Sequence, residues 1–349
     1  MTNKKSPNSG FPLIKLLLAV CFITALIGGW YVWYLIFKPN VPAELPDKFV
    51  HIPTGSDLDD VTRLLFEQGF LIDTVSFRQM ALRMKYRGRA GRFEIQPGWS
   101  NFKLVRHLRS GKQSPVRVVL VNERLPEDVA GKVSRYLEAD SLSLLTLMQD
   151  PVYLDSLGYT PATVMSLFIP NTYEFYWNTS ARKFMERMKV ENDRFWKQND
   201  REEKARKLGL SKVEVYILAS IVERETNVRE EMPRIAGVYL NRLRIGMLLQ
   251  ADPTLVFASR DWESRDLAKY KTLDSPYNTY KYPGLPPGPI SMASIPAIDS
   301  VLNAEKHDYL FFCSTGDGSG RHAFARTYDA HLENVRKYRR ALIERGLGL

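Results

Sequence analysis

Two glutamates lie at the end of one expected helix, residues 211–226, and either could act as an acid or base. The helix has an apolar face made of Val215, Leu218, Ile221 and Val222. At ~100° per residue, Glu225 lies about 20° from Leu218 on the helical wheel, whereas Glu223 lies about 140° away. A carboxylate on an apolar face is costly to ionise, so its pKa should rise, as a general acid for glycoside cleavage requires. The pattern favours Glu225, with Glu223 as second choice; a structural ion pair is the alternative.

Three later segments combine amide, hydroxyl and aromatic side chains with rigid turns. They are residues 246–254 (GMLLQADPT), 275–280 (SPYNTY) and 284–290 (GLPPGPI). Such a mixture suits a sugar, because amides and hydroxyls bind its OH groups and aromatic rings cover its C–H faces. Ordinary turn chemistry explains the prolines and glycines equally well.

The elements that hold these residues are mainly helical. Ser211 followed by Glu214 predicts a capping box at the start of the glutamate helix. Residues 241–243 (NRL) end an apolar helix that begins near Ile235. Residues 138–210 also have a helical pattern, interrupted by the aromatic stretch 168–176, and Ser180 is expected to cap the helix after it.

Residues 48–140 contain a degenerate repeat of strand, turn and helix. The three passes begin at the short β-type runs 49–52, 93–95 and 116–121, each followed by an expected helix. Ser56 and Ser100 are the predicted N-caps of the first two helices. Units of this size resemble LysM modules, which bind glycans that contain N-acetylglucosamine. The alternative is a small α+β packing domain with no ligand.

The N-terminus predicts a membrane anchor. Residues 16–37 have no charge, which is long enough for a helix to cross a bilayer's ~30 Å core. Three lysines precede the span and one follows it, so residues 1–15 are expected in the cytoplasm and the rest outside. Residues 38–47, with three prolines, are expected to be an extended linker. A cleaved signal peptide and lipidation at Cys21 are the rival explanations.

Composition limits the class of protein. The chain has 349 residues, 44% hydrophobic and 25% charged, with a formal net charge of +10, which is typical of a folded protein. Its basic residues are unclustered, so a nucleic-acid role is not expected. Cys21 lies in the apolar run and Cys313 near the C-terminus, so neither a disulfide nor a metal site is expected.

Taken together, these features resemble the MltG (YceG-like) family of endolytic murein transglycosylases. The matching motifs are 219–226 (ASIVERET), 241–243 (NRL), 250–254 (QADPT), 277–280 (YNTY) and 284–288 (GLPPG). The resemblance covers about residues 12 to 345 in the expected order. It departs from the family at Asn171, where an Asp is common, and at residues 122–124 (NER), where a Glu-Gly turn is expected.

The resemblance implies an α+β fold with three parts. These are the transmembrane helix (16–37), a LysM-like domain (48–140) that binds glycan or packs, and a mainly helical α+β YceG-like catalytic domain (141–349). The family's catalytic glutamate corresponds to Glu225. The motifs also make Gln250, Asp252, Asn278 and Tyr280 the candidates for binding the sugar. His322 and Phe324 are candidates for the edge of the cleft.

The implied reaction cleaves the β-1,4 bond between MurNAc and GlcNAc and leaves 1,6-anhydroMurNAc ends, so that strand elongation is terminated or trimmed. It needs no cofactor and no metal. The expected partners are peptidoglycan strands, the cytoplasmic (inner) membrane crossed once and cell-wall synthesis proteins, with the catalytic domain on the periplasmic side. Two alternatives stay open: a non-catalytic peptidoglycan-binding protein, and a hydrolytic muramidase with Asp252 as its second carboxylate.

Overall fold

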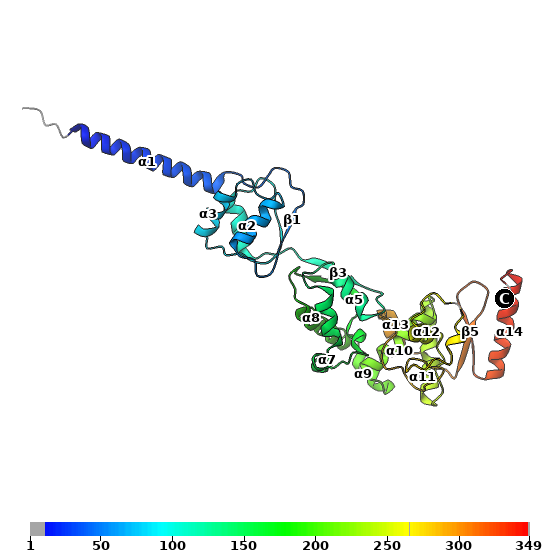
Figure 1. The fold of residues 1–349 in the computed structure, drawn as a ribbon. Helices are drawn as coiled ribbons and strands as arrows, with labels where there is room; N and C mark the ends of the chain where they lie inside the picture. Colours follow the sequence, from blue (N-terminus) through cyan, green and yellow to red (C-terminus); the bar gives the residue numbers. More distant parts are fainter. Residues whose placement is uncertain (1–10, 265, 348–349) are drawn as a thin grey trace, which may run out of the picture. The chain divides into compact units, whose positions relative to one another are not determined.

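The computed structural model describes residues 11–264 and 266–347, which form a mixed α and β fold (Figure 1). The helices are α1 (Phe11–Phe37), α2 (Leu58–Glu67), α3 (Thr74–Arg83), α4 (Asn101–Ser110), α5 (Pro126–Val133), α6 (Ser141–Gln149), α7 (Pro151–Leu157), α8 (Ala181–Lys197), α9 (Arg201–Leu208), α10 (Lys212–Glu225), α11 (Met232–Arg244), α12 (Asp252–Ser259), α13 (Ile295–Leu302) and α14 (Tyr328–Glu344). Short 3-10 helices are η1 (Val164–Leu167), η2 (Arg229–Glu231) and η3 (Ala268–Tyr270). The strands are β1 (Phe49–Ile52), β2 (Gly91–Glu94), β3 (Val116–Leu120), β4 (Asn171–Phe175), β5 (Phe311–Ser314) and β6 (His322–Ala325).

The chain divides into two compact units. Unit 1 comprises the residues up to Val116 together with Tyr176–Asn178, and unit 2 comprises Arg117–Phe175 and the residues from Thr179 onward. The expected third pass of the repeat lies in unit 2, because β3 pairs with β4 and α5 packs against α6. The division at 116/117 therefore falls earlier in the chain than the predicted boundary at 140.

Unit 1 is built around the antiparallel pair β1 and β2. Val50 lies opposite Phe93, and Ile52 lies opposite Gly91. The alternation of the strands turns Val50, Ile52 and Phe93 inward, and all three are fully buried in the core. Helices α2 and α3 connect the two strands and α4 follows them; α3 is an additional helix that the predicted repeat of strand, turn and helix did not include.

The N-cap of α2 is Asp57, so the prediction of Ser56 is wrong by one residue. The carboxylate of Asp57 accepts hydrogen bonds from the N–H groups of Asp59 (2.8 Å) and Asp60 (2.9 Å). The carboxylate of Asp60 in turn accepts the N–H of Asp57 at 3.2 Å. Asp57, directly before Leu58, is at the position from which a side-chain oxygen reaches the free N–H groups of the second and third helical residues.

Helix α1 carries no charged residue from Leu16 to Phe37, and its last turn enters the fold of unit 1. Residues Leu13–Phe37 have a mean hydropathy of 2.2, and among the described residues this is the one helix long and apolar enough to cross a membrane. Its last turn differs, because Leu35 is 1% exposed and lies in the core of unit 1. Residues 38–47 also pack on this unit: Val41 is 1% exposed, and the N–H of Asn40 donates to the carbonyl of Trp99. The expected extended linker is therefore part of the unit.

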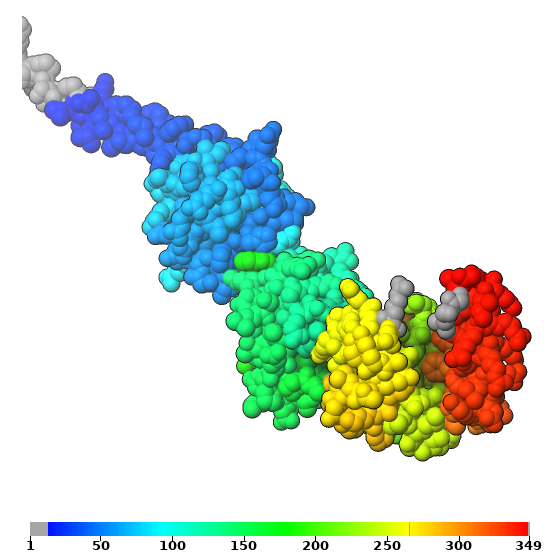
Figure 2. Space-filling view, turned by 45° about the vertical axis from the view of Figure 1, so that its right-hand side comes forward, coloured from blue at the N-terminus to red at the C-terminus, as the bar shows by residue number. Residues whose placement is uncertain are grey.

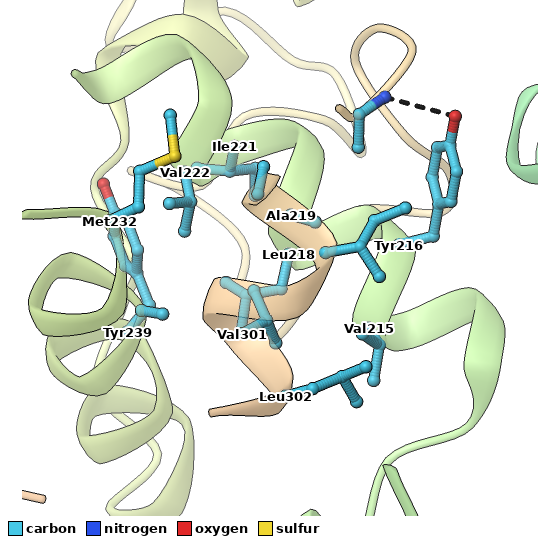
Figure 3. Packing of buried hydrophobic residues seen from close by; sticks show 14 of the residues in the cluster. Val215, Tyr216, Leu218, Ala219, Ile221, Val222, Met232, Tyr239, Val301 and Leu302 are labelled. Carbon is cyan, nitrogen blue, oxygen red and sulfur yellow. Dashed lines mark hydrogen bonds between the residues drawn. The ribbon is translucent and has the colours of Figure 1, made fainter. Parts of the chain in front are cut away.

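Unit 2 has a core centred on α10. Eight consecutive residues of this helix, from Val215 to Val222, are buried, so the helix is enclosed on all sides and not only along the predicted apolar face. It packs against α13 and α11 (Figure 3). The buried polar side chains of α10, Tyr216 and Ser220, have hydrogen-bond partners within the protein. Tyr216 donates to the carbonyl of Phe168 (2.7 Å) and accepts the N–H of Ala293 (3.1 Å).

Candidate active site

Helix α10 ends at Glu225, inside a cavity of unit 2. The capping box predicted from Ser211 and Glu214 is present at the other end of the helix, where each residue's side chain accepts the other's N–H. The cavity measures about 360 Å³, and Figure 2 shows a recess between the yellow-green and the orange-to-red parts of unit 2. Its lining is Glu225, Tyr239, Arg242, Gln250, Asp252, Tyr280, Phe311, Phe312, Cys313, Ser314, His322, Tyr328 and His331.

Glu225 is surrounded by protein and keeps only part of its surface open to the cavity. Burial raises the pKa of its carboxyl to about 7, because removal of water disfavours the charged form. The hydrogen bond from Tyr239 opposes this pKa rise, the nearby charge of Asp252 adds to it, and the charge of Arg242 opposes it. A carboxyl with this pKa can donate a proton near neutral pH and take one back.

Two residues of α11 act on the Glu225 carboxyl, Tyr239 through a hydrogen bond and Arg242 through its charge. The hydroxyl of Tyr239 donates to Oε1 of Glu225 at 2.5 Å. Arg242 lies one turn further along the same face and is 7% exposed; its guanidinium donates to the carbonyls of Leu310 (2.7 Å) and Leu249 (2.5 Å). Neither residue was a predicted site residue, although the spacing of Tyr239 and Arg242 in the helix that ends in NRL is a signal that could have found them.

Three of the four predicted sugar-binding residues lie in this cavity with Glu225. Asp252 begins α12 and accepts a hydrogen bond of 2.5 Å from the hydroxyl of Tyr280. Burial and this hydrogen bond raise the pKa of Tyr280, so its hydroxyl stays protonated. Gln250 adopts a left-handed backbone (φ 49°) and donates its N–H to the carbonyl of Thr279. The QADPT and YNTY segments are thus joined directly.

The fourth predicted residue, Asn278, is not at the cavity. It is fully buried, and its side-chain amide donates to the carbonyls of Lys271 (3.0 Å) and Leu273 (2.8 Å). Its side-chain oxygen accepts the N–H of Tyr280 at 3.0 Å. The assignment of Asn278 to direct sugar contact therefore has no geometric support; it fixes the loop that presents Tyr280.

Glu223, the second choice for the acid, also lies outside the lining of the cavity. Its carboxylate accepts a hydrogen bond from the hydroxyl of Ser294, the N-cap of α13. This contact ties the end of α10 to the start of α13. Two residues along a helix change the direction of a side chain by ~200°, which is why two neighbouring glutamates have such different surroundings.

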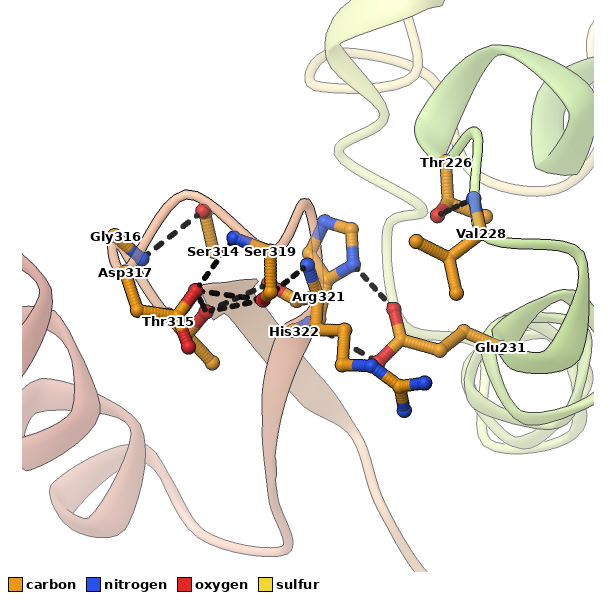
Figure 4. Close-up of polar contacts among 10 residues, drawn as sticks. All are labelled: Thr226, Val228, Glu231, Ser314, Thr315, Gly316, Asp317, Ser319, Arg321 and His322. Atoms are coloured by element: carbon orange, nitrogen blue, oxygen red, sulfur yellow. Dashed lines mark hydrogen bonds and ion pairs between the residues drawn. The ribbon is translucent and has the colours of Figure 1, made fainter.

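The opposite wall of the cavity includes the β5–β6 hairpin. His322 begins β6 and is fixed by Glu231, which is 5% exposed (Figure 4). The carboxylate of Glu231 accepts the main-chain N–H of His322 at 3.1 Å and contacts Nδ1 of its ring at 2.9 Å. Because a carboxylate only accepts, Nδ1 carries the proton. Phe324, the other edge candidate, packs against Tyr309 and Phe312 instead of lining the cavity.

The described residues form no cluster of metal-binding side chains. Among residues 11–264 and 266–347, no group of three or more His, Cys, Asp or Glu side chains is arranged to share a metal ion. The cavity instead offers the Glu225 carboxyl of raised pKa, the Asp252 carboxylate hydrogen-bonded to a tyrosine, one arginine and two histidines.

Comparison with known proteins places these features in a family. The profile described as the YceG-like family matches residues 50–337. The endolytic murein transglycosylase of Bacillus subtilis (strain 168) is 25% identical over 334 residues, which cover 90% of this chain and 91% of that protein. The protein of the same name from Streptococcus pneumoniae serotype 2 (strain D39 / NCTC 7466) is 26% identical, covering 93% of this chain and 65% of its own length. The crystal structure of a YceG-like protein from Listeria monocytogenes has a TM-score of 0.54 and 28% identity, covering 82% of this chain and 97% of that one.

Proposed function

The chain belongs to the YceG-like family, and from that premise we propose that it is an endolytic murein transglycosylase with Glu225 as its acid and base. Relatives of that name match at least nine-tenths of this chain, which supports the reaction class. The observation on which the proposal depends is the single carboxyl of raised pKa in the cavity, since a protein that only binds peptidoglycan has no use for it.

The reaction exchanges one bond to the anomeric carbon for another. Protonated Glu225 donates its proton to the glycosidic oxygen, and the bond from that oxygen to C1 of MurNAc breaks. The C6 hydroxyl oxygen of the same MurNAc forms a new bond to C1, and its proton passes to the ionised Glu225. No water is consumed, the product has a 1,6-anhydro end, and the carboxyl is ready for another cycle.

The other cavity residues have supporting roles in this proposal. The hydroxyl of Tyr239 and the charge of Arg242 stabilise the ionised form of Glu225 after it has given up its proton. Gln250, Asp252 and Tyr280 offer the amide, carboxylate and hydroxyl groups that bind sugar hydroxyls. His322 lines the same cavity from the β5–β6 hairpin.

Glu225→Gln tests the proposal. The variant should fold and lose at least about 10²-fold in glycan cleavage, because general acid–base catalysis contributes roughly that much. Glu223→Gln is the matched control; it lies on the same turn but outside the cavity, so it should keep most of the activity. Cleavage at the full rate by the Glu225→Gln protein would contradict the mechanism.

A hydrolytic muramidase is the second candidate, because Asp252 is a second carboxylate in the same cavity. Mass spectrometry of digested peptidoglycan separates the two: anhydro ends support the transglycosylase and reducing ends the muramidase. The hydrogen bond from Tyr280 to Asp252 favours the transglycosylase, since it occupies part of the carboxylate that a water-activating base would need.

We also propose that α1 is a retained anchor in the cytoplasmic membrane, with both units outside it. The burial of Leu35 supports retention, because cleavage of a signal peptide after α1 would remove a side chain from the core of unit 1. Unit 1, with two helices between antiparallel strands, is proposed to be the LysM-like glycan-binding module. Retention of the Glu225→Gln protein on insoluble peptidoglycan, and its loss when unit 1 is deleted, would test this role.

A further inference from the structure

Helix α3 runs back along α1 from the point where α1 ends. At its start, the N–H of Asp73 donates to the side-chain oxygen of Asn40 (2.8 Å), and the amide of Asn40 donates to the Asp73 carbonyl (2.7 Å). Further along α3, the side chain of Gln79 accepts a hydrogen bond from the hydroxyl of Tyr31. The guanidinium of Arg83 lies 5.8 Å from the centre of the Tyr31 ring. The C-terminal end of α3 is therefore level with Tyr31 and not with the end of α1.

Tyr31 lies at the depth where the membrane meets water. About 20 apolar residues are needed to cross the hydrocarbon core, so a span that begins at Leu13, the first residue of the apolar stretch of α1, ends near Val32. Trp30 and Trp33 are 61% and 56% exposed on α1, as expected for the aromatic residues of an interfacial belt. Tyr31 is about 9 Å before the last residue of α1, at 1.5 Å per residue. Anything level with Tyr31 is therefore among the lipid headgroups.

The surface at this end of α3 has the composition of a membrane-binding segment. Residues 74–93 contain six lysines and arginines and no acidic residue. Arg83, Lys85 and Arg87 are exposed, and Arg83 also lies near the Tyr31 ring. Of the other three cations, Arg78 pairs with Asp59, and Arg89 and Arg92 donate to main-chain carbonyls. Leu82, in the last turn of α3, is 60% exposed. An apolar side chain among cations is suited to an anionic bilayer surface, where each Lys or Arg is attracted by the headgroup charge.

We propose that residues 82–87, the end of α3 and the turn after it, dock on the outer surface of the bilayer that α1 spans. Leu82 enters the headgroup region, and Arg83, Lys85 and Arg87 bind the phosphates of anionic lipids. Because Leu35 is in the core of unit 1, helix and unit move as one body, and unit 1 is held against the membrane. This proposal rests on the membrane anchoring proposed above.

Depth-dependent fluorescence quenching tests the contact in the full-length chain. Cys21→Ala and Cys313→Ser remove the native thiols, and Leu82→Cys carries an environment-sensitive fluorophore. The protein is reconstituted in vesicles of phosphatidylethanolamine and phosphatidylglycerol that contain spin-labelled lipids. Thr54→Cys, in the turn that follows β1, is the control label; Figure 1 labels β1 on the side of unit 1 away from α3. The Leu82 label should be blue-shifted and quenched, and the Thr54 label should be neither.

A charge reversal adds a second measurement. Arg83→Glu, Lys85→Glu and Arg87→Glu together should reduce quenching at Leu82 to the level at Thr54. The matched control reverses three exposed cations elsewhere in unit 1, Lys48, Arg63 and Lys112, and should leave quenching unchanged.

The outcomes separate this proposal from the anchoring. If the Leu82 label is unquenched while the chain resists extraction from the vesicles by alkaline carbonate, the docking is overturned and the anchor stands. If the chain is extracted, the anchor itself fails, and the docking with it. Quenching that survives the reversal of residues 83, 85 and 87 would overturn the assignment of these side chains to lipid phosphates.

Discussion

The pKa of the Glu225 carboxyl is raised to about 7, so at neutral pH the protonated and ionised forms of this side chain are both populated. Burial alone would raise the pKa of a carboxyl further, and the Tyr239 hydroxyl and the charge of Arg242 limit the rise to about 7. A group with this pKa is both a competent acid and, once ionised, a competent base. The reaction proposed here needs both states of the same carboxyl in one turnover.

Tyr239→Phe tests this balance. The hydrogen bond favours the ionised form of Glu225, so its loss should raise the pKa of the carboxyl above about 7. The step that needs a protonated Glu225 should then persist to higher pH. In a profile of kcat/KM against pH, the alkaline limb of the variant should lie at higher pH than that of the parent protein.

Tyr328→Phe is the control for Tyr239→Phe, because it removes a hydroxyl from the same cavity by a change in α14. Its alkaline limb should stay in place. A limb that moves downward in Tyr239→Phe, or does not move at all, would show that the tyrosine does not stabilise the carboxylate.

At the scale of elements, the cavity depends on two connections between distant segments. The start of α12 is joined to the loop of residues 277–280 (YNTY). The hydroxyl oxygen of Thr279 accepts the N–H of Ala251 at 3.0 Å and lies within hydrogen-bonding distance, 2.8 Å, of the hydroxyl of Thr254. The β5–β6 hairpin is joined to the start of α11 through Glu231 and His322. Each connection is made by buried polar groups, which specify a geometry more narrowly than apolar packing does.

Glu231→Ala should loosen the hairpin wall. It leaves the buried N–H of His322 without its acceptor, so the free energy of unfolding should fall by about 1–3 kcal/mol. With His322 no longer fixed, KM for glycan strands should rise more than kcat falls. Thermal unfolding and steady-state kinetics measure the two effects.

Glu230→Ala is the matched control for Glu231→Ala, since Glu230 is exposed and one residue away. Its stability should stay within about 0.5 kcal/mol of the parent protein, as is usual for exposed positions. Equal losses in both variants would mean that the bond between Glu231 and His322 does not hold the hairpin.

At the scale of the whole molecule, the last turn of α1 lies in the hydrophobic core of unit 1. Leu35 packs with residues such as Leu104, Val105 and Phe77, and residues 38–47 lie against the same unit. The extended linker predicted for residues 38–47 would instead have separated unit 1 from the end of α1. The observed packing instead fixes the distance of unit 1 from the end of α1.

Truncation near the end of α1 tests this shared core. A chain that begins at Tyr34 retains Leu35, whereas one that begins at Lys38 loses it. The shorter chain should unfold at lower denaturant concentration, with a loss of about 2–5 kcal/mol, because removal of a buried leucine leaves a cavity. Unfolding of unit 1 followed through Trp99 should report the difference, and equal stability of the two chains would contradict it.

The family, the helix that ends in Glu225 and the choice of that residue over Glu223 all followed from the sequence. These features are local: a capping box, a helical period and a set of short motifs are each encoded within a few residues. The α+β class and the apolar N-terminal helix were predicted on the same basis, and the family prediction is confirmed by the match to residues 50–337.

Tertiary structure alone decided which motif residues meet. Tyr239, Arg242 and His322 line the cavity with Glu225, and Glu231 fixes His322, although these residues come from segments far apart in the chain. Asn278 and Tyr280 are two positions apart in one motif, yet Asn278 bonds the main chain of its own loop and Tyr280 lines the cavity and bonds Asp252. Contacts between residues far apart in the chain depend on how whole elements pack, and that packing is a property of the folded chain and not of any short segment.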